Sequence, residues 1–132
     1  MTALLDTHVL LWWLGDERKL SAKQRRVVLA ASPGEPLLVS DITLWEIATL
    51  FEIGRIELDM PLRDWLEQAV APPYVRTVPI SPAVAAEVAT LPSSFHRDPA
   101  DRIIVSTARV WGATLLTRDK RIARCGLVPV ID

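Results

Sequence analysis

Short apolar runs alternate with amphipathic stretches along the whole chain. The runs contain three or four apolar or β-branched residues and are too short for helices, so they predict buried strands of a parallel sheet. Each run ends at a polar or turn-forming residue. The predicted strands are Ala3–Leu5, Leu37–Val39, Thr77–Ile80, Thr114–Thr117 and Val128–Ile131.

The stretches between these runs carry the start and stop signals of helices. Ser21 and Gln24 have the spacing of a capping box, Pro82 stands at a first helical position, and Gly112 follows an amphipathic run that opens after Asp98. The predicted helices are Val9–Leu14, Ser21–Ala31, Ile42–Ile53, Pro61–Val70, Pro82–Thr90, Asp98–Trp111 and Lys120–Arg124.

Strands separated by helices imply parallel crossovers, and therefore an α/β fold with three layers and a central, mainly parallel sheet of four to five strands. At 132 residues, half of them hydrophobic, the chain has the size of one domain spanning residues 1–132.

The charge pattern shows a local basic region in a nearly neutral chain. Fifteen basic and sixteen acidic residues give a net charge of -1, so the chain as a whole is no polycation. Between Arg97 and Arg124, however, seven basic residues stand against three acidic ones, a local charge of +4. Any nucleic-acid contact is expected there.

Cysteine and histidine are scarce. Cys125 has no second cysteine to pair with, and with only His8 and His96 there is no zinc-type ligand cluster. Neither a signal peptide nor a membrane-spanning run is recognisable, so we expect a soluble, cytoplasmic protein with no membrane association. His8 stands on a first helical turn and is expected to pack or hydrogen-bond locally.

Four acidic residues occupy comparable places beside the predicted strands. Asp6 follows the first strand and Asp119 the fourth, while Glu46 and Asp101 stand early in helices. Carboxylates gathered at one sheet edge repel one another unless a cation lies between them, and an all-oxygen set favours Mg²⁺ or Mn²⁺. Asp6 and Asp119 share an ion only if their strands are neighbours.

Each acid also has a structural interpretation. Asp6 and Asp98 are good helix N-caps, Thr43 and Glu46 have capping-box spacing, and Asp119 could stand in a solvated turn. Glu46 lies beside a predicted inward-facing stripe of its helix, formed by Ile42, Trp45, Leu50 and Ile53.

Basic residues flank two of the acids. They would suit a site that holds a metal and receives a phosphodiester backbone, although any one of them could simply be solvated. The candidate residues for contact with such a backbone are Arg97, Arg102, Arg118, Lys120 and Arg121.

Four segments, in order, resemble the PIN-domain family, in particular the VapC-type toxin ribonucleases of bacterial and archaeal toxin–antitoxin pairs. The segments are Leu4–Trp12, Ser40–Ala48, His96–Val105 and Leu115–Asp119. The resemblance implies a PIN fold, one or two Mg²⁺ or Mn²⁺ ions, endonucleolytic cleavage of RNA by metal-activated water, a cognate antitoxin that covers the site and a homodimer. It places catalytic and metal-binding roles on Asp6, Glu46, Asp101 and Asp119, with Thr7 near the metal and Asp98 either a further ligand or a helix cap.

Two other functions fit parts of the pattern. In a phosphoaspartyl protein of the haloacid-dehalogenase or receiver type, Asp6 would be a nucleophile, but His8 stands where a second aspartate is expected. A non-cleaving RNA- or protein-binding module would not need four acids in one place. Trp12, Trp13 and Trp65 are candidate contact residues for a partner, although most of the five tryptophans could instead belong to the core.

Overall fold

A computed structural model describes residues 1–132, and its elements follow the predicted order. A short 3₁₀ helix, η1, is the one element that was not predicted. The elements are β1 (Ala3–Leu5), α1 (Thr7–Leu14), η1 (Glu17–Lys19), α2 (Ala22–Leu29), β2 (Leu37–Ser40), α3 (Asp41–Glu52), α4 (Leu62–Ala69), β3 (Val75–Val78), α5 (Pro82–Val88), α6 (Pro99–Trp111), β4 (Thr114–Leu116), α7 (Lys120–Ala123) and β5 (Val130–Ile131).

The five strands form one parallel sheet in the order β3-β2-β1-β4-β5. Leu5 of β1 is paired with Val39 of β2 on one side and with Leu116 of β4 on the other. Strands β2 and β3 therefore extend the sheet on one side of β1, and strands β4 and β5 extend it on the other. The direction in which successive strands are added reverses between β1 and β4. In open parallel sheets such a reversal leaves a crevice outside the carboxyl ends of the two strands.

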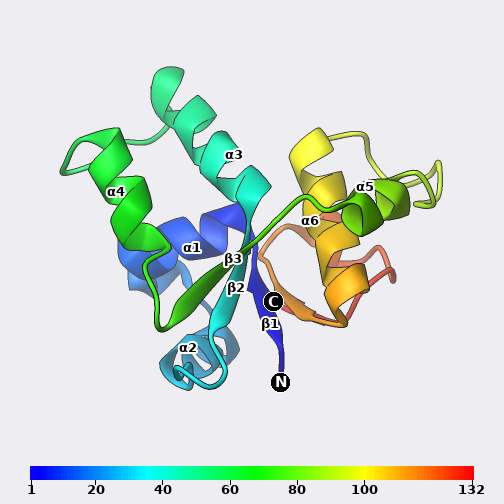
Figure 1. The fold of residues 1–132 in the computed structure, drawn as a ribbon, viewed down its shortest axis with the longest axis horizontal. Coiled ribbons are helices and arrows are strands. Elements are labelled where there is room, and N and C mark those ends of the chain that lie inside the picture. Colours follow the sequence, from blue (N-terminus) through cyan, green and yellow to red (C-terminus); the bar gives the residue numbers. More distant parts are fainter.

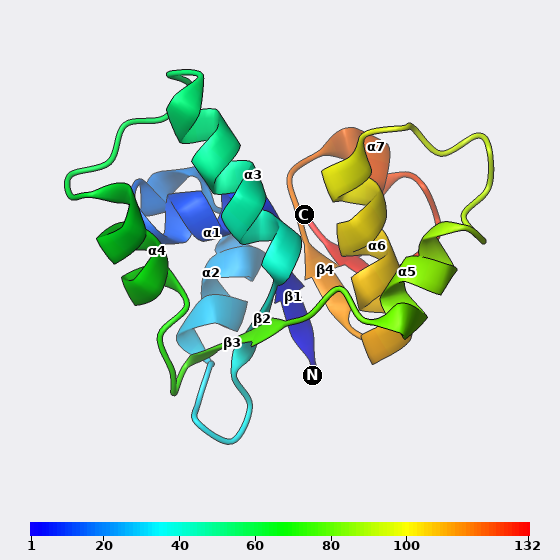
Figure 2. The ribbon, with the colours of Figure 1, turned by 45° about the horizontal axis from the view of Figure 1, so that its top comes forward.

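Alternate residues of the central strands face opposite layers. Leu5 belongs to one apolar cluster, with Val9, Leu10 and Trp65, whereas Leu4 belongs to a second, with Ile104. Figure 1 shows α1, α2 and α4 on one side of the sheet and α5 and α6 on the other. Figure 2 shows α7 beside α6, near β4. The predicted three-layer α/β fold with a parallel sheet is confirmed.

Two strands differ from their predicted bounds because of proline. β3 runs over Val75–Val78 instead of Thr77–Ile80, and β5 begins at Val130 instead of Val128. Pro79 and Pro129 lack a backbone N–H and so cannot donate to a sheet ladder. Each strand therefore lies wholly on one side of its proline.

The predicted inward face of α3 is wrong. Thr43 and Ile47 are the buried residues of this helix, whereas Trp45 is 58% exposed and Ile53 56% exposed. Their spacing of four still makes one face of a helix, but the face is rotated from the predicted stripe. Glu46 consequently lies at the border of the buried face.

The long helix α6 matches its prediction at both ends. Asp98 caps its start, and Gly112 ends it in the left-handed conformation at φ 60°, which a glycine adopts without a side-chain clash. α6 has 13 residues, and no helix of the structure has the length and apolar character needed to cross a membrane.

Candidate active site

Asp6 lies where β1 meets α1, and it is almost fully buried. Its backbone N–H donates to Leu116 O at 2.9 Å, which extends the pairing of β1 with β4. Its carboxylate caps α1 by accepting from the Thr7 N–H at 2.8 Å, and it accepts from the Thr117 hydroxyl at 2.6 Å. Burial raises the pKa of Asp6, the Thr117 hydrogen bond lowers it, and the charge of Asp101 raises it again, with a net upward shift.

Asp119 is joined to Asp6 through a single side chain. The Asp119 N–H donates to Thr117 Oγ1 at 3.1 Å, and that same hydroxyl donates to Asp6. Asp119 also caps α7 and accepts from Arg121 Nη2 at 3.0 Å. Burial raises the pKa of Asp119, but the hydrogen bonds from Arg121 outweigh it and the net shift is downward. Strands β1 and β4 are neighbours, as the shared site requires.

Glu46 contributes a carboxylate oxygen with no partner. Its Oε1 is buried and makes no hydrogen bond. Burial raises the pKa of Glu46, the nearby Thr7 hydroxyl lowers it, and the charges of Asp6, Asp101 and Asp98 raise it further. Ser40 caps α3 by accepting from the Ile42 N–H at 3.2 Å, so the alternative of a Thr43–Glu46 capping box is wrong.

Asp98 and Asp101 stand at the start of α6. Asp98 Oδ1 accepts from the Asp101 N–H at 3.0 Å, which confirms its role as the helix cap. Asp101 Oδ2 lies 2.7 Å from His96 Nε2 and 3.7 Å from Arg121 Nη2. Burial raises the pKa of Asp101, the contact with His96 lowers it, and the charge of Asp98 raises it, so that the net shift is upward.

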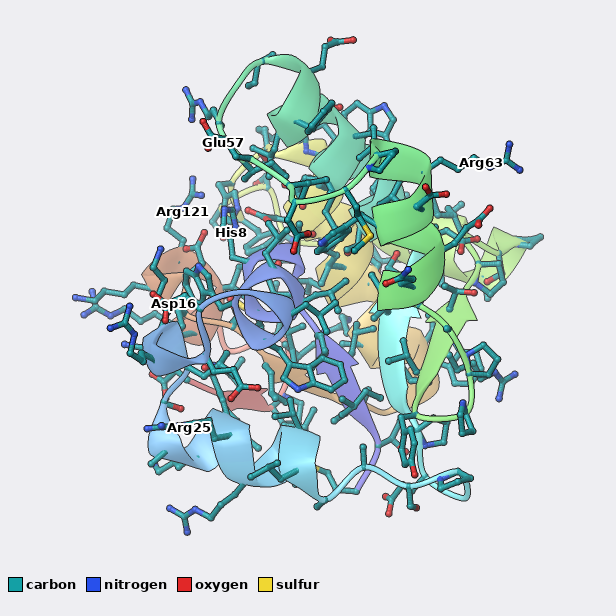
Figure 3. All side chains as sticks on the ribbon, turned by 90° about the vertical axis from the view of Figure 1, so that its left-hand side faces the viewer. His8, Asp16, Arg25, Glu57, Arg63 and Arg121 are labelled. Carbon is teal, nitrogen blue, oxygen red and sulfur yellow. The ribbon has the colours of Figure 1, made fainter.

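These side chains line one pocket of about 460 Å³ beyond the carboxyl ends of β1 and β4. Only two of its eleven lining residues are hydrophobic. Figure 3 shows His8 and Arg121, from α1 and α7, close together on one side of the molecule, with Arg63 far from them. The lining residues are Asp6, His8, Trp12, Glu46, Leu50, Arg55, Asp98, Asp101, Arg118, Asp119 and Arg121.

The donor set of this pocket fits a hard divalent cation. All four predicted acids are present, three of them have a raised pKa, and the buried Glu46 oxygen has no partner, so added positive charge would relieve each of these costs. No three His, Cys, Asp or Glu side chains are gathered around a common point. Asp101 and Asp119 are instead engaged by His96 and Arg121.

The predicted RNA-binding residues divide into two groups. Arg118 and Arg121 are exposed and line the pocket, while Arg97 and Lys120 are exposed next to Asp98 and Asp119. Arg102 was predicted wrongly, because it is only 7% exposed and its guanidinium donates to backbone carbonyls. A sequence pattern does not distinguish a buried arginine from a solvated one.

Three further side chains at the site were not predicted. Thr117 bridges Asp6 and Asp119, His96 contacts Asp101, and Arg55 lines the pocket just after α3. Thr117 and His96 stand within motifs already recognised, whereas Arg55 follows a turn at Gly54 and has no sequence signal.

The three tryptophans predicted as candidate partner contacts differ in burial. Trp12 and Trp13 are half-buried, and the Trp12 ring lies 5.9 Å from the His8 ring. Trp65 is only 9% exposed and belongs to the apolar core, so it was predicted wrongly as a partner contact. It lies on the inward face of α4 together with Ala69.

Residues 3–127 match the model of the family described as PIN domain. The chain belongs to the PIN domain family. This PIN domain is 43% identical over 121 residues to Ribonuclease VapC22 of Mycobacterium tuberculosis, an overlap of 92% of this chain and 89% of that protein. The predicted resemblance to VapC-type PIN domains is thereby confirmed.

Solved structures show the same fold at low sequence identity. The PIN domain matches VapBC-1 from nontypeable Haemophilus influenzae with a TM-score of 0.75 and 16% identity, covering 100% of this chain and 98% of that one. It matches VapBC2 from Rickettsia felis, bound to a DNA fragment from its promoter, with a TM-score of 0.74 and 14% identity, covering 99% and 98%.

Proposed function

We propose that this PIN domain is a Mg²⁺- or Mn²⁺-dependent endoribonuclease, the toxin of a toxin–antitoxin pair. The observation that carries the proposal is the meeting of Asp6, Glu46, Asp101 and Asp119, from four different elements, in one polar pocket. The relative named Ribonuclease VapC22 supports RNA as the substrate.

The four acids would hold one or two ions, with Thr7 nearby and Asp98 at the pocket wall. A bound ion would supply Lewis acidity to the phosphodiester and lower the pKa of the attacking water molecule. The water oxygen would bond to phosphorus as the bond from phosphorus to the 3′ oxygen breaks. Thr117 and the Thr7 N–H hold Asp6 in one orientation through their hydrogen bonds at 2.6 and 2.8 Å. Glu46, with its unpartnered Oε1, is the acid we assign to accept the proton of the attacking water.

The exposed basic residues around the pocket would bind the RNA backbone. Arg118 and Arg121 line the pocket itself, and Arg97 and Lys120 stand directly beside two of the acids. Phosphate neutralisation by such side chains makes affinity fall steeply with salt concentration. Arg121 already contacts Asp119, so it would exchange this partner for phosphate when RNA binds.

The central test is cleavage of an RNA that contains unpaired loops by the purified protein, with Mg²⁺, with Mn²⁺ or with EDTA. We expect cleavage with either ion, none in EDTA, and a loss of at least about 100-fold in Asp6→Asn, the scale of removing one charge-stabilising group from an active site. Cleavage that survives EDTA or Asp6→Asn would overturn the proposal. Acid-labile phosphate on Asp6 would favour the phosphoaspartyl alternative.

RNA binding is tested separately in the Asp6→Asn background, where cleavage does not interfere. We expect Arg118→Gln and Arg121→Gln each to weaken binding and to reduce its salt dependence by about one unit of slope. The matched control is Arg25→Gln, because Arg25 is also an exposed arginine and lies on α2, away from Arg121 (Figure 3). Equal effects at Arg25 would indicate general charge attraction only.

The toxin role implies a protein partner. The structural neighbours include a toxin–antitoxin complex from Klebsiella pneumoniae, which supports an antitoxin for this chain. We expect the product of the adjacent gene to co-purify with the protein and to inhibit its cleavage of RNA. The homodimer, the cytoplasmic location and the single-domain extent over residues 1–132 stay predictions, and sedimentation analysis tests the first of them.

A further inference from the structure

Arg102 of α6 is a buried arginine with no carboxylate partner. Its Nη1 donates to Phe95 O and His96 O, both at 3.3 Å, and its Nη2 donates to Val88 O at 3.4 Å. A buried charge is costly unless polar groups surround it, and here those groups are backbone carbonyls. The guanidinium therefore ties the end of α5 and the segment before α6 to the first turn of α6.

The segment that Arg102 holds carries a histidine aimed at the active site. His96 Nε2 lies 2.7 Å from Asp101 Oδ2, and the His96 side chain is 19% exposed. Its ring packs against the ring of Phe95 with 4.4 Å between the centroids, and Phe95 is itself buried. The imidazole is thus fixed by its backbone, by an aromatic neighbour and by the carboxylate.

Asp101 has few other contacts that fix its carboxylate. Its backbone N–H donates to the Asp98 carboxylate and does not orient its side chain. Arg121 Nη2 lies 3.7 Å from Asp101 Oδ2, which is too far for a hydrogen bond. Oδ1 of Asp101 accepts no hydrogen bond from the protein, so the His96 contact on Oδ2 is the one hydrogen bond that orients this side chain.

We propose that His96 is a positioning residue for Asp101, and that Arg102 keeps His96 in place. One oxygen of Asp101 is held by the imidazole and the other is left for the ligand of the pocket. Groups that orient metal-binding side chains in this way change metal affinity or activity by about 10- to 100-fold when they are removed. The proposal rests on the proposed function of the carboxylate pocket and deepens it.

The test compares His96→Leu with His96→Gln. Leucine cannot hydrogen-bond to Asp101, whereas the glutamine amide N–H₂ can donate to it. We expect His96→Leu to bind Mn²⁺ about 10- to 100-fold more weakly in isothermal titration calorimetry, and to lower kcat for RNA cleavage with KM little changed. His96→Gln is expected to recover most of both losses, while the thermal unfolding midpoints of the two variants agree.

His8→Leu is the matched comparison, because His8 lines the pocket that contains Asp101 without a hydrogen bond to any carboxylate. We expect its Mn²⁺ affinity to exceed that of His96→Leu. In Arg102→Met three backbone carbonyls lose their donor, so both the unfolding midpoint and Mn²⁺ affinity should fall.

Three results would overturn the proposal. Unchanged Mn²⁺ affinity in His96→Leu would remove the positioning role and leave the proposed nuclease intact. Equal losses in His8→Leu and His96→Leu would replace positioning by a general effect of imidazoles near the pocket. Failure of the wild-type protein to bind Mn²⁺ or Mg²⁺ would instead overturn the metal site, and the role of His96 with it.

Discussion

The two edges of the sheet carry pockets of opposite character. At the carboxyl edge lies the pocket of about 460 Å³ that contains the acids, in which two of eleven lining residues are hydrophobic. At the amino edge lies a pocket of about 300 Å³ in which six of nine are hydrophobic, including Ala3, Val27 and Leu37. The two pockets have no lining residue in common. The same strands β1 and β2 therefore begin beside an apolar surface and end at a polar one.

The difference follows from where helices begin. At the carboxyl edge four strands are followed by a helix start, and the caps of those starts are Asp6, Ser40, Ser81 and Asp119. Helix N-termini present unpaired N–H groups that donate readily to carboxylates, which favours acids at this edge. A helix cap and a metal ligand are therefore not competing interpretations of Asp6 or Asp119, since the capping geometry is what brings the two carboxylates to the site.

Charges at the amino edge are handled differently. The N-terminal ammonium of Met1 pairs with Glu35, and both groups are about half exposed. At the carboxyl edge, by contrast, Asp6 and Asp101 are buried and each raises the free-energy cost of ionising its neighbours. This asymmetry predicts that substitutions at the carboxyl edge lower RNA cleavage, whereas substitutions at the amino edge leave cleavage unchanged even where they lower stability.

Among the substitutions that compare the two edges, the largest effect is expected from Thr117→Val, just after the carboxyl end of β4. Valine has the shape of threonine but removes the hydroxyl that donates to Asp6 and accepts from the Asp119 N–H. We expect cleavage to fall about 10- to 100-fold. The free energy of unfolding, measured by urea denaturation, should fall by about 1.5–3 kcal/mol because a hydrogen bond to a charged group is lost.

Thr114→Val is the control for this experiment, because Thr114 begins the same strand at the amino edge and its side chain makes no hydrogen bond. It should cleave RNA at the wild-type rate. Equal losses in the two variants would mean that Thr114 and Thr117 matter only for the strand itself, and the contrast between the edges would fail.

A second prediction concerns the pH dependence of stability, measured in EDTA so that no cation contributes. The pKa of Asp6 is raised in the folded protein, so folding favours its protonated form. The free energy of unfolding is therefore not reduced by Asp6 below about pH 4, the ordinary range of aspartate. It falls as pH rises from there toward the folded pKa, because ionising the buried carboxyl costs free energy. Asp6→Asn should therefore exceed the wild type in stability by a margin that grows with pH and then levels off.

Asp119→Asn gives the opposite sign. Arg121 lowers the pKa of Asp119, so its ionised form stabilises the folded state above the ordinary range and that contribution is lost as pH falls. The variant should be less stable than the wild type at neutral pH, with a deficit that disappears in acid. If the stability of both variants changes with pH in the same direction, the surroundings of Asp6 and Asp119 do not shift the two pKa values in opposite directions.

Elements and motifs were accessible from the sequence because they depend on local patterns. The strand exits at Asp6 and Asp119 and the cap at Asp98 follow from residue type and spacing. The pairing of β1 with β4 does not, since strand order is set by packing of residues far apart in the chain. The sequence could therefore predict a common site of Asp6 and Asp119 only if β1 and β4 are neighbours. The structure shows that they are.

Burial of single side chains was the part that the sequence could not supply. Arg102 and Trp65 were predicted at the surface and are buried, whereas Trp45 was predicted inside and is exposed. For the two tryptophans a rotation of the helix by one residue position changes the environment, and helix periodicity alone does not fix that rotation. Arg102 is buried because this part of α6 is covered on nearly all sides. His96 was missed for a related reason, because its contact with Asp101 depends on the loop conformation that Arg102 holds.

The smallest effect on activity is expected from Val27→Ala, in the pocket at the amino edge. Val27 is a half-buried residue of α2 that packs against the apolar cluster. Its truncation removes two partly buried methyl groups, so the free energy of unfolding should fall by about 1 kcal/mol. Cleavage measured well below the unfolding temperature should match the wild type, because no side chain that lines this pocket lines the other. Leu50→Ala makes the matched change beside the acids and should lower cleavage, whereas equal cleavage by the two variants would show that the edges of the sheet are not functionally distinct.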